Sequence, residues 1–385
     1  MIELDDRLLC LRRESRALAA ALRERALELD ADPDAISRYL DLPAMELMAA
    51  TLIPPEYLGS PLRAGRPEYH GMGCLERVVV LEELARGDVG GVLAAPGPSL
   101  SGAIVHALGD DEQKQWYYRT LLARPTWTFF ALTEPDRGSD AGQLTTRLRP
   151  AGTNGWVLNG HKRYIGNAVR ASLGVVIARS SDGPLGITAA LVDTGDPGFT
   201  ASAIPTVGLR AARLSAISLD DVPVPDERIL GRHLPASRRG LRAVLATFTQ
   251  LRPGVAALAV GTAEAALDYV REHRRALRPA ERDDLDRFSG RIGAVRQLVY
   301  RAAAEVDAGP GNGLLASAAK ARAAPLAEQA TMFALGFFGP GARLDHPMLD
   351  KLARDARGLE FMEGTSTVQK LMLAQGYLRG QLAHA

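Results

Sequence analysis

Residues 127–134, WTFFALTE, are a short run of aromatic, β-branched and apolar residues that divides the chain into two parts of different character. Before it, up to about Arg124, apolar residues recur every three or four positions, for example in LERVVVLEELARGDVGG at 75–91. This spacing is typical of α-helices. After it come LGVVIARS at 173–180, ITAALVD at 187–193 and SAISLDDVPVP at 215–225, which read as strands. The run at 127–134 therefore predicts the start of a mainly β segment.

The segment GWVLNGHKRYIGNA at 155–168 contains an Asn159-Gly160 step between two strand-like arms. Asn-Gly is the strongest local signal for a two-residue β-hairpin turn. We therefore predict a hairpin that turns at Asn159-Gly160.

The helical period returns after about Pro235 and holds to the end of the chain. The order is thus helical, β, helical, with strands clustered rather than alternating with helices, which argues against a doubly wound sheet. We predict an α+β protein with an N-terminal all-helical domain (1–126), a central β-barrel-like domain (127–234) and a C-terminal four-helix bundle (235–385).

Charge and composition limit the kinds of partner. The 385 residues include 46 Lys plus Arg and 45 Asp plus Glu, a net charge of +1. Such a chain has no strong field to attract nucleic acid or an anionic membrane, so we expect a small-molecule partner. The N-terminus lacks an uninterrupted apolar segment, and we expect a cytoplasmic protein.

Several chemistries find no support in the motifs. Cys10 and Cys74 lack the close spacing of a zinc or redox pair, so we expect two reduced thiols and no metal site. The sequence contains no HExxH, no GxSxG and no Gly-rich loop after a strand of the Rossmann or P-loop kind. Metal-dependent hydrolysis, triad chemistry and P-loop phosphoryl transfer are therefore disfavoured.

One carboxylate near the C-terminus lies in unusual surroundings. In GLEFMEGTSTVQKLMLAQGYL (358–378), Glu363 follows the apolar pair Phe361-Met362 and precedes a helix start. We expect this pair to raise the pKa of Glu363 by desolvation. Ser366 with Gln369 reads as a capping box, and Val368, Leu371 and Met372 read as one apolar stripe. Considered alone, Glu363 is better explained as a carboxylate that suits the dipole of the helix that follows.

Several segments together resemble the acyl-CoA dehydrogenase family of flavoproteins, in the family's order and over nearly the whole chain. They are PPEYLG (54–59), LEELARGDVG (81–90), LGDDEQKQWY (108–117), ALTEPDRGSD (131–140), VGLRAARLSAISLDDVPVP (207–225) and LDKLARDARGLEFMEGTSTVQ (349–369). The resemblance implies an FAD-dependent oxidoreductase that introduces an α,β double bond into an acyl thioester, with FAD between the β domain and the bundle.

The resemblance also assigns roles to residues. It makes Glu363 the general base, and a thioester α-proton is weakly acidic, so a carboxylate of raised basicity suits that task. Flavin N5 would accept the hydride. Arg252 matches an arginine near the base and substrate, although a structural ion pair explains an isolated arginine equally well.

The cofactor-binding residues implied by the resemblance come from both halves of the chain. They are Phe130, Leu132, Thr133, Ser139, Tyr164, Gly166, Gly339, Gly341 and Thr365. Tyr164 and Gly166 stand where the family usually has Trp and Thr. Tyr keeps a stacking surface, whereas Gly lacks a hydroxyl group for N5, which leaves a flavin oxidase or monooxygenase as an alternative.

Other positions depart from the family pattern. His273 and Ala276 replace an Arg and an aromatic residue expected to reach FAD on a neighbouring subunit, and Leu335 and Phe338 replace a Gln and a Gly. These losses weaken the expected homodimer or homotetramer and leave a flavin-poor binding or scaffolding protein as a second alternative.

Two further departures concern the acyl carrier. Thr249 and Gln375 replace an Asp and an Arg expected near the thioester carrier, which favours a phosphopantetheinylated carrier protein beside CoA as the substrate's carrier. The acyl group and the electron acceptor, an electron-transfer flavoprotein or oxygen, stay open.

Overall fold

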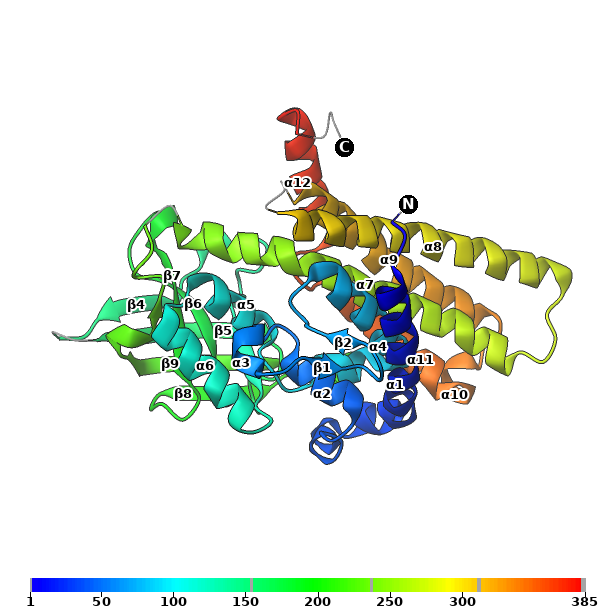
Figure 1. The fold of residues 1–385 in the computed structure, drawn as a ribbon, viewed down its shortest axis with the longest axis horizontal. Helices are drawn as coiled ribbons and strands as arrows, with labels where there is room; N and C mark the ends of the chain where they lie inside the picture. Colours follow the sequence, from blue (N-terminus) through cyan, green and yellow to red (C-terminus); the bar gives the residue numbers. More distant parts are fainter. Residues whose placement is uncertain (1, 153–154, 236–237, 310–312, 382–385) are drawn as a thin grey trace.

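The N-terminal part of the molecule is helical. The computed structural model describes residues 2–152, 155–235, 238–309 and 313–381. In Figure 1 the β-rich part lies at one end and long helices extend to the other. The N-terminal helices are α1 (Asp6–Ala31), α2 (Pro43–Ala50), α3 (Pro55–Leu58), α4 (Cys74–Ala94), α5 (Ser99–Leu108) and α6 (Asp111–Ala123). A small antiparallel pair, β1 (Leu62–Arg63) with β2 (Glu68–Tyr69), connects α3 to α4.

The central part is an eight-stranded sheet. Its strands are β3 (Thr128–Ala131), β4 (Arg147–Pro150), β5 (Trp156–Ile165), β6 (Leu173–Arg179), β7 (Ile187–Asp193), β8 (Phe199–Ala203), β9 (Ser215–Val224) and β10 (Ile229–Leu230). They lie in the order β10-β7-β6-β4-β5-β9-β8, and β3 pairs with β6. The β3–β6 and β4–β6 pairs are parallel and the others antiparallel.

The strand β6 shows why this sheet forms. Its side chains alternate between two apolar cores, with Val175 and Ile177 in one and Val176 and Ala178 in the other. Because both faces are covered, the strand is buried along its whole length and reads as a continuous apolar run.

The predicted hairpin at Asn159-Gly160 is wrong. Both residues lie inside the continuous strand β5, where the register against β9 shifts between Leu158 and Gly160. Gly160 has φ 145°, and an added Cβ would come 2.8 Å from Cα of Thr146. The glycine therefore serves a β-bulge and a close backbone approach rather than a turn.

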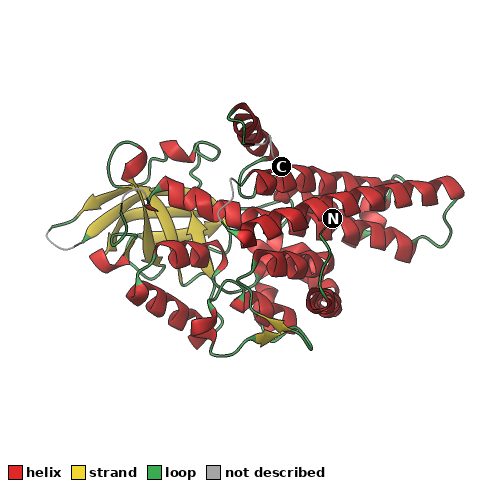
Figure 2. Cartoon of the chain, turned by 45° about the horizontal axis from the view of Figure 1, so that its top comes forward, coloured by secondary structure: helices red, strands yellow, loops and turns green. Residues whose placement is uncertain are grey.

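The C-terminal part is a helical bundle. It comprises α7 (Leu241–His273), α8 (Pro279–Ala308), α9 (Leu314–Gly336), α10 (Ala342–Asp345), α11 (Pro347–Leu359) and α12 (Ser366–Leu378). Figure 2 shows the long helices side by side, with α12 projecting from the bundle. The predicted class, a helical domain, a β domain and a C-terminal bundle, is confirmed. The remaining short elements are the 3-10 helices Pro33–Arg38, Ala141–Gln143, Pro184–Gly186, Arg210–Ala212 and Asp226–Arg228.

Helix α7 is long and apolar enough to cross a membrane by length and composition alone. In its most apolar 18-residue window, 61% is buried inside the protein. The helix packs against α4, α8 and α9, so its apolar composition is explained by its place in the core.

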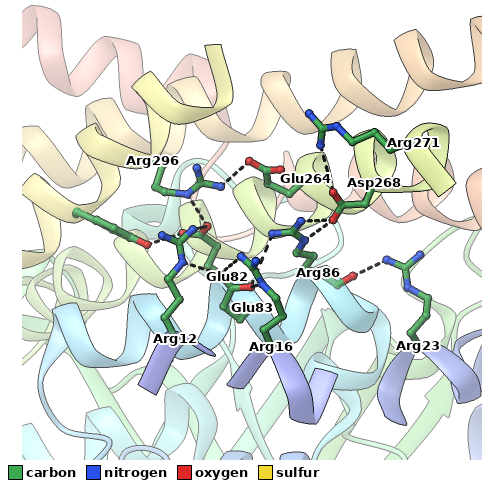
Figure 3. A network of polar contacts seen from close by, with 11 residues as sticks. Arg12, Arg16, Arg23, Glu82, Glu83, Arg86, Glu264, Asp268, Arg271 and Arg296 are labelled. Atoms are coloured by element: carbon green, nitrogen blue, oxygen red, sulfur yellow. Dashed lines mark hydrogen bonds and ion pairs between the residues drawn. The ribbon is translucent and has the colours of Figure 1, made fainter. Parts of the chain in front are cut away.

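A network of charged side chains joins the N-terminal helices to the bundle (Figure 3). On α4, Glu83 binds Arg12 and Arg16 of α1, each at 2.7 Å. The neighbouring Glu82 binds Arg296 of α8, which also reaches Glu264 of α7 at 2.7 Å. The shared carboxylates therefore link side chains of four helices, α1, α4, α7 and α8.

Candidate active site

The turn between α11 and α12 carries Glu363 in a restricted conformation. Glu363 has φ 50° and Gly364 has φ 92°, so two consecutive residues lie in the left-handed region. For a non-glycine residue this region is unfavourable and needs support from the surrounding structure. Such outliers occur preferentially where a functional side chain must be held in one direction.

Three side chains from three helices hold this turn by its backbone carbonyl groups. Arg252 of α7 donates from Nε to the carbonyl oxygen of Glu363 at 3.5 Å. Gln369 of α12 donates from Nε2 to the same oxygen at 3.0 Å and to that of Gly364 at 3.4 Å. Lys320 of α9 donates from Nζ to the carbonyl oxygen of Glu360 at 2.6 Å. These hydrogen bonds therefore fix the backbone of the turn and do not involve the Glu363 carboxylate.

The Glu363 carboxylate is buried and unpaired on one side. Although the residue as a whole is only partly buried, its Oε2 atom is buried and has no hydrogen-bond partner among the residues that the structure describes. Burial raises the pKa of Glu363 to about 8, while the positive charges of Arg252, Lys320 and Arg77 act to lower it. A buried carboxyl with a raised pKa and an unpaired oxygen is a candidate for a functional site rather than for a structural ion pair.

The apolar surroundings of Glu363 differ from those that the sequence predicted. Phe361 is 62% exposed, with the Arg357 guanidinium 5.3 Å from its ring centroid, so it does not desolvate the base. Met362 does pack against the main core. The helices around the turn therefore supply most of the apolar environment.

The capping of α12 also differs from the expectation. Thr365, not Ser366, is the N-cap residue, and its hydroxyl accepts from the Val368 N–H at 3.3 Å. Ser366 donates its N–H and its hydroxyl group to the Glu360 carboxylate, at 2.7 and 2.6 Å. Because Gln369 is engaged with the turn carbonyls, the predicted Ser366–Gln369 capping box does not form.

The predicted apolar stripe on α12 is not a buried face. Leu371 is 59% exposed, whereas Val368 and Met372 are partly buried. Helix α12 packs mainly against α9.

The segment predicted to contact the flavin lies at the end of strand β3, and buried polar side chains hold it in place. Lys162 is buried and donates to the carbonyl oxygen of Leu132 at 2.9 Å and to the Glu134 carboxylate at 3.1 Å. Glu134 also accepts from the backbone and hydroxyl groups of Thr145 and Thr146, at 2.6 to 2.8 Å. These contacts hold the pKa of Glu134 down at about 2, although burial opposes them. The loop after β3 is therefore firmly placed, with Phe130 and Thr133 partly buried beside it.

The surroundings of Tyr164 and Gly166 fit a planar ligand such as a flavin. Tyr164 is 54% exposed with φ 62°, and the Arg163 guanidinium lies 5.4 Å from its ring centroid. An added Cβ at Gly166 would meet no atom within 4 Å. An exposed aromatic ring beside open space suits a ring that stacks.

The other predicted cofactor residues lie in different places. Ser139 is exposed in the loop after β3, and Thr365 is on the base-bearing turn. Gly339 and Gly341 lie between α9 and α10, at the other end of α9 from the base-bearing turn. The structure does not bring these two glycines to the other candidate residues within the chain.

The substituted positions near Gly339 form an aromatic cluster. The rings of Tyr269 and His273 stack at 3.8 Å, and the Tyr269 hydroxyl lies 3.0 Å from Nδ1 of His346. Phe338 packs on His346 with ring centroids 4.0 Å apart. His273 and Phe338 thus have partners within the chain.

The two positions linked to the acyl carrier are also defined. The Thr249 hydroxyl donates to the Leu245 carbonyl oxygen at 3.2 Å and accepts from Arg252 at 3.4 Å. Gln375 is exposed on α12. Neither position presents a charged group.

Sequence reasoning missed Lys320 and Arg77, and it gave Gln369 a capping role instead of its hydrogen bonds to the turn carbonyls. Lys320 could have been noticed as the one charged residue on the buried face of the Ala-rich run LLASAAKARAA (314–324), where Arg322 is exposed. Arg77, 6% exposed on α4, binds the carbonyl oxygens of Met72 and Gln250. No sequence signal marks it, because its nearness to Glu363 depends on how α4 packs.

Comparison with known proteins covers nearly the whole chain. The models for the acyl-CoA dehydrogenase N-terminal, middle and C-terminal domains match residues 14–124, 129–222 and 238–378. A 3-(aryl)acrylate reductase of Clostridium sporogenes is 33% identical over 327 residues, covering 81% of this chain and 85% of the relative.

Solved structures of the same fold agree. Butyryl-CoA dehydrogenase of Megasphaera elsdenii superposes with a TM-score of 0.84 at 26% identity, over 98% of this chain and 100% of that one. The prolyl acyl carrier protein oxidase AnaB gives 0.82 at 23%, over 97% and 100%. A Mycobacterium smegmatis glutaryl-CoA dehydrogenase in complex with FADH2 gives 0.82 at 23%, over 99% and 97%. The last two show the fold alone. The chain belongs to the acyl-CoA dehydrogenase family of oxidoreductases.

Proposed function

We propose that this protein catalyses FAD-dependent α,β-dehydrogenation of an acyl thioester, with Glu363 as the general base. The observation that carries the proposal is the carboxylate of Glu363, which is buried, unpaired at Oε2 and held by its backbone in a left-handed turn. Its pKa of about 8 makes it basic enough to accept a proton from carbon at moderately alkaline pH.

The cofactor of this family is FAD, and the site accommodates it. Phe130, Leu132, Thr133 and Ser139 would hold it from the β domain, Tyr164 would stack and Gly166 would leave room, and Thr365 would approach from α12. When bound, FAD supplies the hydride acceptor at N5. Gly339 and Gly341 stay proposed contacts to FAD of a neighbouring subunit.

Two side chains of the protein take part in the proton transfer: Glu363 accepts the proton and Arg252 positions Glu363. Glu363 takes the α-proton of the thioester on its carboxylate, and Arg252 keeps the carboxylate in place through the Glu363 carbonyl group. Arg252 is 3% exposed, and burial lowers its pKa while the charge of Glu363 opposes this. We therefore assign Arg252 to the base rather than to a surface ion pair.

The carrier of the acyl group is proposed to be CoA or a phosphopantetheinylated carrier protein. The carrier-protein alternative rests on Thr249 and Gln375, which provide hydroxyl and amide groups where a carboxylate and a guanidinium are expected. Both carriers have the same phosphopantetheine arm, so the reacting end of the substrate is unchanged.

An oxidase is the second candidate reaction. The space beside Gly166 contains no atom within 4 Å of an added Cβ. Because oxygen needs access to the reduced flavin, this space and the missing hydroxyl favour such reactivity. Gly166→Thr would fill the space, and in an oxidase it should slow reoxidation in air.

We also propose a cytoplasmic homo-oligomer, a dimer or tetramer. On α12, Leu371, Tyr377 and Leu378 are 59%, 70% and 83% exposed. A mainly apolar groove of ≈ 690 Å³ lies between α8, α9 and α12, with Val295 and Leu298 among its lining residues. Exposed apolar area of this kind favours association with a second copy.

The test is anaerobic mixing of the FAD-loaded protein with acyl thioesters on CoA and on a carrier protein, followed by absorbance. Bleaching of the oxidised flavin band with one carrier class supports dehydrogenation and identifies the carrier. Glu363→Gln should bind FAD but show no bleaching. Normal reduction by that variant would refute Glu363 as the base.

A further inference from the structure

Lys320 is a buried cation beside the base-bearing turn. It lies on α9 between alanines and is 0% exposed. Its Nζ donates to the Glu360 carbonyl oxygen at 2.6 Å and lies 4.0 Å from the Glu360 carboxylate. Burying an ammonium group is costly, and neutral donors could serve a carbonyl oxygen as well. The charge itself therefore needs an explanation.

The positive charges that act on Glu363 come from three helices. Arg252 is on α7, Lys320 on α9 and Arg77 on α4, and all three act on the Glu363 carboxyl as positive charges. The turn itself contributes the Glu360 carboxylate, whose hydrogen bonds go to Ser366.

Two other titratable groups lie on the α4 side. Cys74 has its thiol pKa raised to about 12 by burial, with Glu363 among the smaller contributors. Asp307 of α8 accepts from the backbone N–H groups of Cys74 and Leu75, at 2.6 and 2.8 Å. The thiol therefore stays neutral at ordinary pH, and Asp307 is engaged at the start of α4.

We propose that Lys320 is a positioning residue for the proposed base: its ammonium group fixes the turn through Glu360 and supplies positive charge that favours the ionised form of Glu363. Only the catalytic role of Lys320 depends on the proposed function. The electrostatic effect on Glu363 can be measured whether or not the protein dehydrogenates a thioester.

Two observations support this role over simple anchoring. The ammonium group approaches the turn from α9, where no direct bond to the Glu363 carboxylate forms among the described contacts. It therefore adds charge without blocking the oxygen that must accept a proton. The pKa of Lys320 is lowered to about 8 by burial, while Glu360 and Glu363 oppose this. The pKa values of Lys320 and Glu363 thus both lie near 8, and the charge of each group acts on the other.

The experiment compares three variants with the wild type. Lys320→Met removes the charge at similar length, and Lys320→Arg keeps a charge throughout the accessible pH range. Lys370→Met is the matched control, since Lys370 is an exposed lysine on α12. The readout is infrared titration of the Glu363 carboxyl group, isolated by subtracting the spectrum of Glu363→Gln in the same background.

The expected shifts have opposite signs. In Lys320→Met the carboxyl should titrate about one pH unit higher, since a nearby opposite charge changes a pKa by about that much or more. In Lys320→Arg it should titrate lower than in the wild type, where Lys320 loses its own charge over the same range. Lys370→Met should leave the titration unchanged.

A second readout separates charge from position. With a reactive acyl thioester, flavin reduction by Lys320→Met should be roughly tenfold slower at pH 7 and recover at alkaline pH. A loss that is equal at every pH, with an unshifted carboxyl titration, would show that Lys320 only anchors the turn and would overturn the proposal. If Lys320→Met fails to fold, an unshifted or raised titration in Lys320→Arg would overturn it equally. Absence of reduction in the wild type would count against the proposed function and leave the infrared result valid.

Discussion

Replacing Glu363 by Gln should make the protein inactive and more stable at the same time. The pKa of Glu363 in the folded protein is about 8, against an ordinary value of 4.5, because the carboxyl is buried. Between these two values the folded state binds more protons than the unfolded state. The contribution of Glu363 to the unfolding free energy of the wild type therefore falls as the pH rises from 4.5 to 8.

The magnitude follows from the size of this shift. Each pKa unit corresponds to about 1.4 kcal/mol, so at pH 7 the cost of burying Glu363 amounts to roughly 3 kcal/mol. At pH 5 it is below about 1 kcal/mol by the same relation. Gln does not titrate, so the variant should gain roughly 3 kcal/mol over the wild type at pH 7 and almost nothing at pH 5.

The assay is chemical denaturation of the FAD-saturated wild type and variant at pH 5, 6, 7 and 8, and the quantity compared is the difference in unfolding free energy. Glu328→Gln is the control, since Glu328 lies on α9 with a side chain 37% exposed and a surface partner, Arg357. The unfolding free energy of Glu328→Gln should differ from that of the wild type by no more than about 1 kcal/mol at every pH. A Glu363→Gln difference that does not grow from pH 5 to pH 7 would refute the conclusion that burial raises the pKa of the base.

Three further predictions concern other parts of the protein. Glu134→Gln should destabilise the protein by roughly 3 kcal/mol in denaturant, because buried Lys162 loses its counter-charge; unchanged stability would contradict the role of this pair behind β3. Lys351→Met should cost about 3 to 5 kcal/mol, because it leaves the buried Asp88 and Asp355 without a cation; a stability equal to that of the wild type would mean that these carboxyls are protonated. The Cys74 thiol should resist alkylation at pH 8 in the folded protein, since burial raises its pKa to about 12, whereas partly exposed Cys10 should react first; rapid labelling of Cys74, detected by mass spectrometry, would show that its environment opens.

Much of the fold could be predicted because apolar periodicity is a local property of the chain. The strands at 128–131, 173–179, 187–193 and 215–224 lie where the apolar runs predicted them. The short strands β4 and β8 were not predicted, since their exposed residues carry little apolar signal. The Asn159-Gly160 step failed as a turn signal because β5 continues through it, paired with β9 across a bulge.

The candidate site, too, could be predicted only in part from the sequence. The motif around Glu363 marked this residue as the proposed base, and the residue lies in a turn with a left-handed backbone conformation. The environment of the base was wrongly attributed to Phe361, which points to solvent beside Arg357. Residues next to each other in sequence need not share an environment, because a turn directs successive side chains to different sides.

The sequence by itself determined the order of helical and β segments and the family, because these depend on residue type and local spacing. Only the tertiary structure decided which cations surround Glu363, the proposed base. Lys320, Arg252 and Arg77 are separated from Glu363 by tens to hundreds of positions and come from α9, α7 and α4. Their convergence depends on how the helices pack, and desolvation and charge act through space rather than along the chain.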